Sequence, residues 1–337
     1  MKKILIILTL VTGFISCKNQ PIEFADYTYT AGYFPYQYPV RTLVLGDYIY
    51  PNENDNNHKF LISAAFGGVY SNKEERKFTV ELAQSLCNNV KFKSTNDTIR
   101  LMPPAYYTLS SSNITIPAGK YNAGIEVQLT DALFNHPLAI KNSYVIPLRI
   151  VSVTNLDSVL RGQPLIANPD PRIAANWVKV PKDFTMFAVK FINPYHGKYL
   201  HRGTSVVTNA SATVLETAVY HTQYIVDNEI WSLVTAGKNK VTISGFTHST
   251  LIPGALKMDL TFADNGNCTI AQAAGSTYTI TGSGSFAKDA DEWGLQKRDA
   301  IYLKYQLTSG ANTFNATDTL VIRDRGVVME TYEPVVF

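Results

Sequence analysis

The chain has 337 residues, enough for two domains with real cores, and it carries 30 Lys and Arg against 27 Asp and Glu. A formal net charge of +3 is too small to indicate a basic surface that binds nucleic acid. Three cysteines in a chain of this length exclude a scaffold stapled by disulfides, so hydrophobic cores must hold the domains together.

The first 17 residues have the pattern of an export signal. Lys2 and Lys3 precede the apolar run Ile4–Val11, and the small residue Ser16 stands directly before Cys17. The run is far too short to span a bilayer. A cysteine at the cleavage point resembles a bacterial lipoprotein signal, which implies that Cys17 is lipidated. No other stretch of the sequence is long and apolar enough to cross a membrane, so we expect attachment through this anchor only.

Residues 22–153 predict a domain of short strands. Arg41–Leu45 ends at a Gly-Asp turn, Arg76–Leu82 and Gly124–Leu129 alternate polar and apolar side chains, and Tyr144–Val153 closes the set. About seven short strands with turns at this spacing are typical of an immunoglobulin-like β-sandwich.

Residues 154–176 differ in composition from the residues that precede them. Gln163-Pro164, Asn168-Pro169 and Asp170-Pro171 are dipeptides that favour extended or turn conformations. We therefore expect this segment to be the linker between two domains.

Residues 177–337 predict a second all-β domain with longer strands. Thr185–Ile192 is the first expected strand, Leu256–Phe262 alternates cleanly, and Asp264-Asn265-Gly266-Asn267 is the strongest hairpin signal in the chain. Eight or more consecutive strands with short turns favour closure, because closure removes unpaired edges. We expect a lipocalin-like up-and-down β-barrel, with a second β-sandwich as the alternative.

Short motifs in both halves carry a family resemblance. Tyr33-Phe34-Pro35, Arg41–Gly46, Ile116–Gly119 and Tyr144–Leu148 resemble domain-of-unknown-function family 1735 of Bacteroidota lipoproteins. In the second half the motifs are similar to family 4361, which often follows the first; they are Phe187–Lys190, Tyr195–Tyr199, Gly282–Gly284 and Asp318–Gly326.

The resemblance implies a lipoprotein of a polysaccharide-utilisation system. Such a protein is expected at the outer membrane, on the cell surface or the periplasmic face, beside a porin and a companion glycan-binding lipoprotein. Its expected ligand is an oligosaccharide or polysaccharide. The resemblance transfers no catalytic residue and no cofactor to this chain.

Aromatic side chains beside polar groups are the candidate glycan-binding residues, since a sugar ring has an apolar face and polar rims. Trp293 is the best candidate because it lies in a polar stretch next to Asp291 and Glu292; the alternative is that it plugs one end of a barrel. The other candidates are Trp231, in a strand-like run where aromatic residues usually pack, and Tyr195 and Tyr199.

Enzyme and metal signatures are not found. The sequence has no nucleophile elbow, zinc-protease motif or phosphate-binding loop, so we expect a protein that is not an enzyme. Two alternatives stay open: an assembly lipoprotein that binds a partner protein, and a glycoside hydrolase, whose two carboxylates need not be close in sequence. No metal site is expected, because the histidine spacings match no ligand motif; these residues are His196, His201, His221 and His248.

Overall fold

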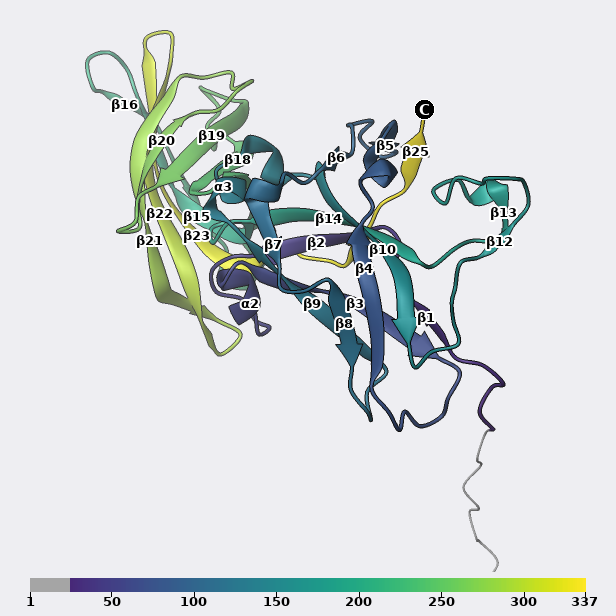
Figure 1. The fold of residues 1–337 in the computed structure, drawn as a ribbon. Helices are drawn as coiled ribbons and strands as arrows, with labels where there is room; N and C mark the ends of the chain where they lie inside the picture. The colour runs from purple at the N-terminus through teal and green to yellow at the C-terminus, as the bar shows by residue number, and fades with distance from the viewer. Residues whose placement is uncertain (1–24) are drawn as a thin grey trace, which may run out of the picture.

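The computed structural model describes residues 25–337, whose regular secondary structure is nearly all β-strand (Figure 1). Cys17 and the export signal lie outside the described residues. Within residues 25–337 no helix has the length and apolar character needed to cross a membrane. The helices of this range are single turns: α2 (Glu53–Asn56), α3 (Asp131–Phe134), η1 (Gln84–Cys87), η2 (Pro104–Tyr106), η3 (Pro137–Ile140), η4 (Ala174–Asn176) and η5 (Ile225–Asp227).

Two curled sheets build the N-terminal module. The first has the strand order β11 (Ser158–Val159), β1 (Ala31–Tyr33), β3 (Lys59–Gly67), β9 (Asn122–Leu129) and β7 (Tyr107–Leu109). The second has the order β24 (Glu330–Thr331), β2 (Pro39–Val44), β14 (Phe184–Ile192), β10 (Tyr144–Thr154), β4 (Arg76–Leu82) and β8 (Asn113–Ile116), with β6 (Arg100–Leu101) beside β10.

One hydrophobic core lies between these two sheets. Ile125, Val127 and Leu129 alternate along β9 and are all buried, while β4 contributes Phe78 and Val80 to the same core. Because successive side chains of a strand point to opposite faces, this alternation turns one face of each sheet inward. The sandwich arrangement expected for this module agrees with the sheets.

The strand that we expected to open the barrel lies instead in the N-terminal module. β14 pairs antiparallel with β10 and parallel with β2, so it is a central strand of the second sheet. Nearly all of its residues are buried, on both faces. A strand covered on both sides is apolar at most positions, and Phe184–Ile192, where only Thr185 and Lys190 are polar, has that pattern rather than the alternation of a barrel strand. The barrel therefore begins after residue 192, not at residue 177.

The first part of the segment 154–176, which was expected to be a linker, packs on the N-terminal module. β11 pairs in parallel with β1, and the Asp157 carboxylate accepts hydrogen bonds from Thr30 N at 2.7 Å and Thr30 Oγ1 at 2.9 Å. The rest projects as a two-stranded arm made of β12 (Gln163–Pro164) and β13 (Trp177–Lys179) (Figure 1).

Eight strands close the C-terminal module into an antiparallel barrel. They follow one another around the ring as β15 (Gly197–Thr208), β17 (Glu229–Gly237), β18 (Lys240–Phe246), β19 (Ala255–Phe262), β20 (Asn267–Gln272), β21 (Ile280–Trp293), β22 (Gln296–Ser309) and β23 (Asn312–Asp324). β23 pairs with β15 from Lys198↔Asp324 to Thr208↔Thr313, which completes the ring. The expected up-and-down barrel is confirmed.

The barrel interior is filled by side chains that alternate along the strands. Leu256, Met258, Leu260 and Phe262 of β19 all point inward, and the Asp264–Gly266 turn joins β19 to β20 as predicted. One strand departs from the ring: β16 (Val214–Tyr220) takes over the edge of β15 from Gly203 onward, where β17 no longer pairs with it. β15 thus changes its neighbour halfway along its length.

The C-terminal segment leaves the barrel and returns to the first module. β24 pairs with β2, and β25 (Pro334–Val336) pairs with β5 (Val90–Phe92). Between them Tyr332 is buried, and its hydroxyl donates a 2.8 Å hydrogen bond to Met186 O of β14. Figure 1 shows the barrel at one end of the molecule and the first module with the C-terminus at the other.

Candidate functional site

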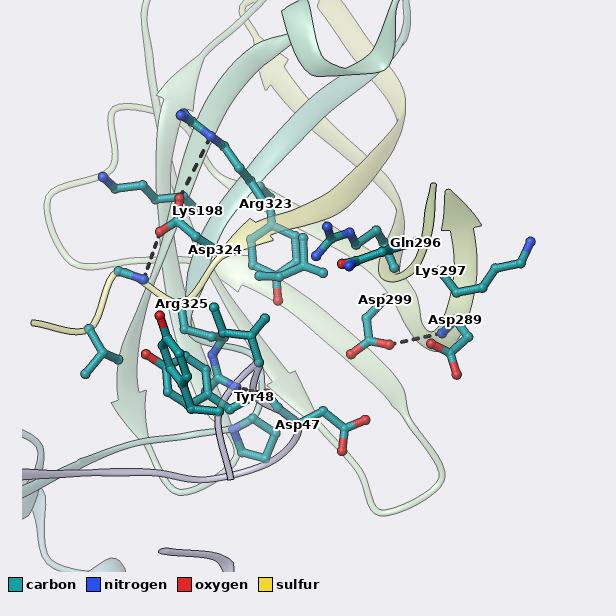
Figure 2. Close-up of a pocket in the computed structure, with 18 of the residues that line it drawn as sticks. Asp47, Tyr48, Lys198, Asp289, Gln296, Lys297, Asp299, Arg323, Asp324 and Arg325 are labelled. Carbon is teal, nitrogen blue, oxygen red and sulfur yellow. Dashed lines mark hydrogen bonds and ion pairs between the residues drawn. The ribbon is translucent and has the colours of Figure 1, made fainter. Parts of the chain in front are cut away.

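A cleft with a volume of about 590 Å³ opens where the barrel meets the first module (Figure 2). This is the size of a small-molecule site, and such sites are frequent at module boundaries. Three segments that are distant in sequence line it, together with Pro194, Lys198 and Tyr199: the loop 47–50, residues 289 and 296–299 of the β21–β22 hairpin, and the segment 322–328.

The loop 47–50 contributes the aromatic wall of the cleft. Tyr50 is 63% exposed, and its ring meets that of Tyr48 edge-on at 5.4 Å between centroids. Backbone contacts fix the loop: Asn52 Nδ2 donates to Val44 O at 2.7 Å and to Gly46 O at 2.8 Å. Gly46 has φ +82° and lies against Pro194, so close that a Cβ there would be 2.7 Å from Pro194 Cβ. Only glycine fits this turn without strain.

Arg325 holds the loop and the barrel together below the cleft. Its buried guanidinium donates to Asp47 O at 2.8 Å, to Leu45 O at 3.0 Å and to Asn193 O at 2.7 Å. A buried cation is tolerated where backbone carbonyls satisfy its donors. The position of the loop 47–50 relative to the segment 322–328 therefore depends on this side chain.

The β21–β22 hairpin forms a second wall, which carries the carboxylates Asp289 and Asp299 beside Lys297 and Arg298. A bulge interrupts the pairing between Ala287 and Asp291, and inside it Asp289 adopts φ +53° and donates its N–H to Asp299 Oδ1 at 3.0 Å. Lys288 Nζ reaches Asp47 Oδ2 at 2.6 Å and links the hairpin to the loop. Burial, with the charges of Asp47 and Asp289, raises the pKa of the Asp299 carboxyl above its ordinary value.

The segment 322–328 and β15 form the facing wall, which carries mostly basic groups. Figure 2 shows Arg323, Asp324 and Lys198 across the cleft from Asp289 and Asp299, with Tyr48 and Asp47 between the two sides. Gly326 N donates to Asp324 Oδ1 at 2.8 Å, which sets the turn that carries Arg325. The cleft therefore combines exposed aromatic rings, carboxylate acceptors and cationic donors.

Trp293 supports the wall of the cleft and does not line it. It lies at the end of β21 rather than in a loop, and its Nε1 donates to Ile322 O at 3.0 Å. The Arg298 guanidinium lies 4.2 Å above its ring. Ile322 and Arg298 both line the cleft, so the tryptophan packs behind them.

The two acidic neighbours of Trp293 are engaged in ion pairs, Asp291 with β15 and Glu292 within the hairpin. Asp291 Oδ2 accepts from Arg202 Nη2 at 2.5 Å, and Glu292 Oε2 lies 2.9 Å from Lys297 Nζ. Neither carboxylate lines the cleft. Their expected role as acceptors for sugar hydroxyls has no support from this position.

Of the remaining predicted residues, only Tyr199 reaches the cleft. Trp231 is 3% exposed and stacks on the His201 ring inside the barrel at 3.7 Å, so a sugar cannot reach its face and that prediction is wrong. Tyr195 stacks on Phe262 at 3.6 Å against the barrel core. Tyr199 lies in the floor of the cleft, but its hydroxyl already donates to Tyr195 O at 3.0 Å.

Sequence reasoning missed the residues that line the cleft most prominently: Tyr48, Tyr50 and Asp299. The signal for the first two was present, since Tyr48-Ile49-Tyr50 follows a Gly-Asp turn and precedes a polar stretch. An aromatic run in a loop has no core to pack into and is a frequent mark of a binding site. No comparable local signal distinguishes Asp299.

A second cavity, of about 730 Å³, lies beside the arm and is lined mainly by proline, aliphatic and aromatic residues. Its cation, Arg172, is already occupied: it pairs with Asp170 at 2.6 Å and donates to Leu86 O and Asn88 O. The cleft at the module boundary is therefore the stronger candidate for a polar ligand.

Models of known protein families match both modules. A family model described as a domain of unknown function, DUF5627, matches residues 194–326, which contain the whole barrel. A model described as a "-like, N-terminal domain" matches residues 26–157. The C-terminal match is thus to DUF5627, where the motifs had suggested family 4361. None of the curated proteins matches the chain.

Solved structures from Bacteroides ovatus resemble the chain. One, a protein of unknown function, is 36% identical, with a TM-score of 0.85, over 93% of this chain and 100% of that one. A second protein of unknown function is 12% identical, with a TM-score of 0.42, over 90% and 100%. A multidomain protein that includes DUF1735 is 11% identical, with a TM-score of 0.42, over 88% and 94%.

Proposed function

Since this chain belongs to the same family as the Bacteroides ovatus protein that is 36% identical to it, and carries a DUF5627 barrel, we propose that it is a non-catalytic, lipid-anchored binding protein of the cell envelope. The proposed ligand is an oligosaccharide, and the proposed context is a polysaccharide-utilisation system at the outer membrane. The proposed anchor is an acylated Cys17.

The cleft at the module boundary carries this proposal. Its loop presents Tyr48 and Tyr50 beside the carboxylate of Asp299 and the cations of Lys198 and Arg323. A sugar ring offers an apolar C–H face to an aromatic ring and hydroxyls to charged acceptors and donors, so this set of side chains matches both. The cleft volume of about 590 Å³ lies within the usual range for ligand sites.

The two walls are connected to each other before any ligand arrives. Lys288 to Asp47 and Arg325 to Asp47 O join the hairpin and the segment 322–328 to the aromatic loop. A pre-formed site loses little entropy on binding, which suits the capture of flexible oligosaccharides.

Affinity electrophoresis through gels that contain different polysaccharides tests the proposal. We expect at least one polysaccharide to retard the protein, and the double variant Tyr48→Ala/Tyr50→Ala to lose about tenfold or more in affinity, as is usual for aromatic hot spots. Tyr70→Ala is the matched control, because Tyr70 is 70% exposed on the first module and does not line the cleft. We expect this control to bind as the wild type does.

Two results would oppose the proposal. Retardation by none of the polysaccharides would remove the glycan and leave the assembly role, in which the cleft binds a partner protein. Release of new reducing ends during incubation with a retarding polysaccharide would show that the protein is a hydrolase.

A further inference from the structure

Two histidines and a glutamate meet where β15 changes its neighbour from β17 to β16. His201 comes from β15, Glu229 from the start of β17, and His248 from the loop between β18 and β19. His248 Nε2 lies 2.7 Å from Glu229 Oε1, and His201 Nδ1 contacts the same oxygen. The three ligand atoms all lie within 4.8 Å of one another.

A buried carboxylate orients the His201 ring. The side chains of His201 and Asp318 are both fully buried, and Asp318 Oδ2 lies 3.0 Å from Nε2 of the ring. In the neutral tautomer that carries its proton on Nε2, next to Asp318, the lone pair is on Nδ1, which faces Glu229 and His248. A carboxylate behind a histidine is the usual outer support of a metal-binding imidazole.

The supporting carboxylate is itself held on both oxygens. Tyr305 OH donates to Asp318 Oδ2 at 2.9 Å, and Tyr220 OH donates to Asp318 Oδ1. The His201 ring is also stacked on Trp231 at 3.7 Å. The imidazole is thus oriented by Asp318 and Trp231, and Asp318 is in turn held by the two tyrosines.

The second histidine is positioned by β16. Its ring stacks on that of Tyr220 with 3.9 Å between centroids. The loop that carries His248 is fastened by Glu216 of β16, which accepts from Ser249 Oγ at 2.5 Å and from Thr250 N at 2.9 Å. This explains why β16 leaves the barrel ring: it holds the His248 loop over the His201 side chain.

We propose that His201 Nδ1, His248 Nε2 and the Glu229 carboxylate bind a divalent transition-metal ion of the zinc class. Two imidazoles and one carboxylate are a common zinc donor set, which leaves a fourth position for water. Ligand bonds of about 2.0–2.1 Å place tetrahedral donors roughly 3.3 Å apart. The Glu229 side chain is 44% exposed and can turn away from the two rings to reach this spacing. Because imidazole binds a metal in its neutral form, the ion would take the place of any proton held between the carboxylate and the imidazoles.

The ion would connect β15, β17 and the β18–β19 loop across the region where β17 leaves β15. From the sequence no metal site was expected, because the histidine spacings match no ligand motif. In the chain Glu229 is 28 residues from His201 and 19 from His248; the pairing of β15 with β17 and the β18–β19 loop bring the three together.

Metal titration of the purified, chelator-treated protein tests this site. We expect one Zn²⁺ per chain by calorimetry, and Co²⁺ to give the visible absorption of a tetrahedral complex. His248→Ala and Glu229→Gln should each weaken Zn²⁺ binding at least tenfold. Asp318→Asn should weaken it by about 10- to 100-fold, as supporting carboxylates do, and change the cobalt spectrum.

His221→Ala is the control, since His221 is an exposed histidine of the same module and contacts only Thr222 O. Thermal unfolding gives a second readout: Zn²⁺ should raise the midpoint of the wild type and of His221→Ala, and leave that of His248→Ala unchanged. Because His248 is partly exposed, its alanine variant should fold. Equal Zn²⁺ affinities of the wild type and His248→Ala would overturn the proposal, and so would an equal loss in His221→Ala.

Discussion

The guanidinium of Arg325 donates a 3.0 Å hydrogen bond to the carbonyl oxygen of Leu45, which lies 280 residues earlier in the chain. The same guanidinium binds Asn193 O at the junction between β14 and β15. One buried side chain therefore joins the end of the barrel, its beginning and the loop that carries the aromatic wall of the cleft.

Arg325→Ala should lower the free energy of unfolding by about 2–4 kcal/mol, because it leaves buried carbonyl groups without a donor. Chemical denaturation measures this loss. Arg323→Ala is the matched control two residues earlier; Arg323 is exposed and pairs only loosely with Asp324, at 3.9 Å, so its removal should change stability by less than about 0.5 kcal/mol. Equal stability of the two variants would contradict the assigned role of Arg325.

The stability of the protein should fall in mild acid because of His196. Burial, with the nearby charges of Arg325 and Lys190, lowers the pKa of His196 from 6.5 to about 4. As the pH falls, the folded state therefore binds this proton at a lower pH than the unfolded state does. The contribution of the neutral ring is complete above pH 6.5 and is lost as the pH falls towards 4, at a cost of about 3 kcal/mol.

His196→Asn tests this assignment. The ring accepts a 3.0 Å hydrogen bond from Thr235 N on Nδ1, and an asparagine oxygen can take the same position without titrating. Unfolding midpoints measured from pH 7 to pH 4 should fall less steeply in this variant than in the wild type. A variant whose curve parallels that of the wild type would show that another group causes the acid sensitivity.

Asp299→Asn should stabilise the protein at neutral pH. Burial raises the pKa of Asp299, so the folded state disfavours the ionised carboxylate. The protonated carboxyl contributes its full share of stability below the ordinary pKa of an aspartate. This contribution is lost as the pH rises through the raised pKa of the folded state. The asparagine variant, which keeps the acceptor for Asp289 N, should melt higher at pH 7 and equal to the wild type near pH 3. A lower melting point at pH 7 would refute this reasoning.

Gly245→Ala should destabilise the barrel by about 1–3 kcal/mol through overpacking. A Cβ at Gly245 would lie 2.7 Å from the Cε2 and Cζ2 atoms of Trp231, which is already stacked on His201. Gly237→Ala is the control, because the nearest atom to its added Cβ would be Lys240 Cβ at 3.6 Å. Thermal unfolding followed by tryptophan fluorescence compares the two, and a smaller effect at Gly245 than at Gly237 would count against the packing.

Local patterns predicted the parts of this fold that are locally determined. The alternation of Leu256–Phe262 and the Asp264–Gly266 turn gave a barrel hairpin correctly, because side-chain period and turn chemistry act over a few residues. The position of β14 could not be predicted in the same way. Its mostly apolar sequence indicates burial on both faces but does not show which module buries it.

The two sites depend on contacts over long sequence separations. Tyr48 and Arg323 face one cleft only because the chain passes from the first module into the barrel and back. Trp293 was expected to bind a ligand because its neighbours in sequence are polar, yet its neighbours in space are Arg298 and Ile322 O. The polarity of neighbouring residues in the sequence therefore does not predict the exposure of a side chain that packs against adjacent strands.

The return of the chain through β24 and β25 makes the barrel an insertion within the first module. β2 and β5 receive their last partners from residues 330–336, which follow the barrel in the chain. The barrel can close as soon as β23 has been synthesised, whereas the first module must wait for these later residues. A chain that stops after Asp324 would complete its second module and leave its first one with two open edges.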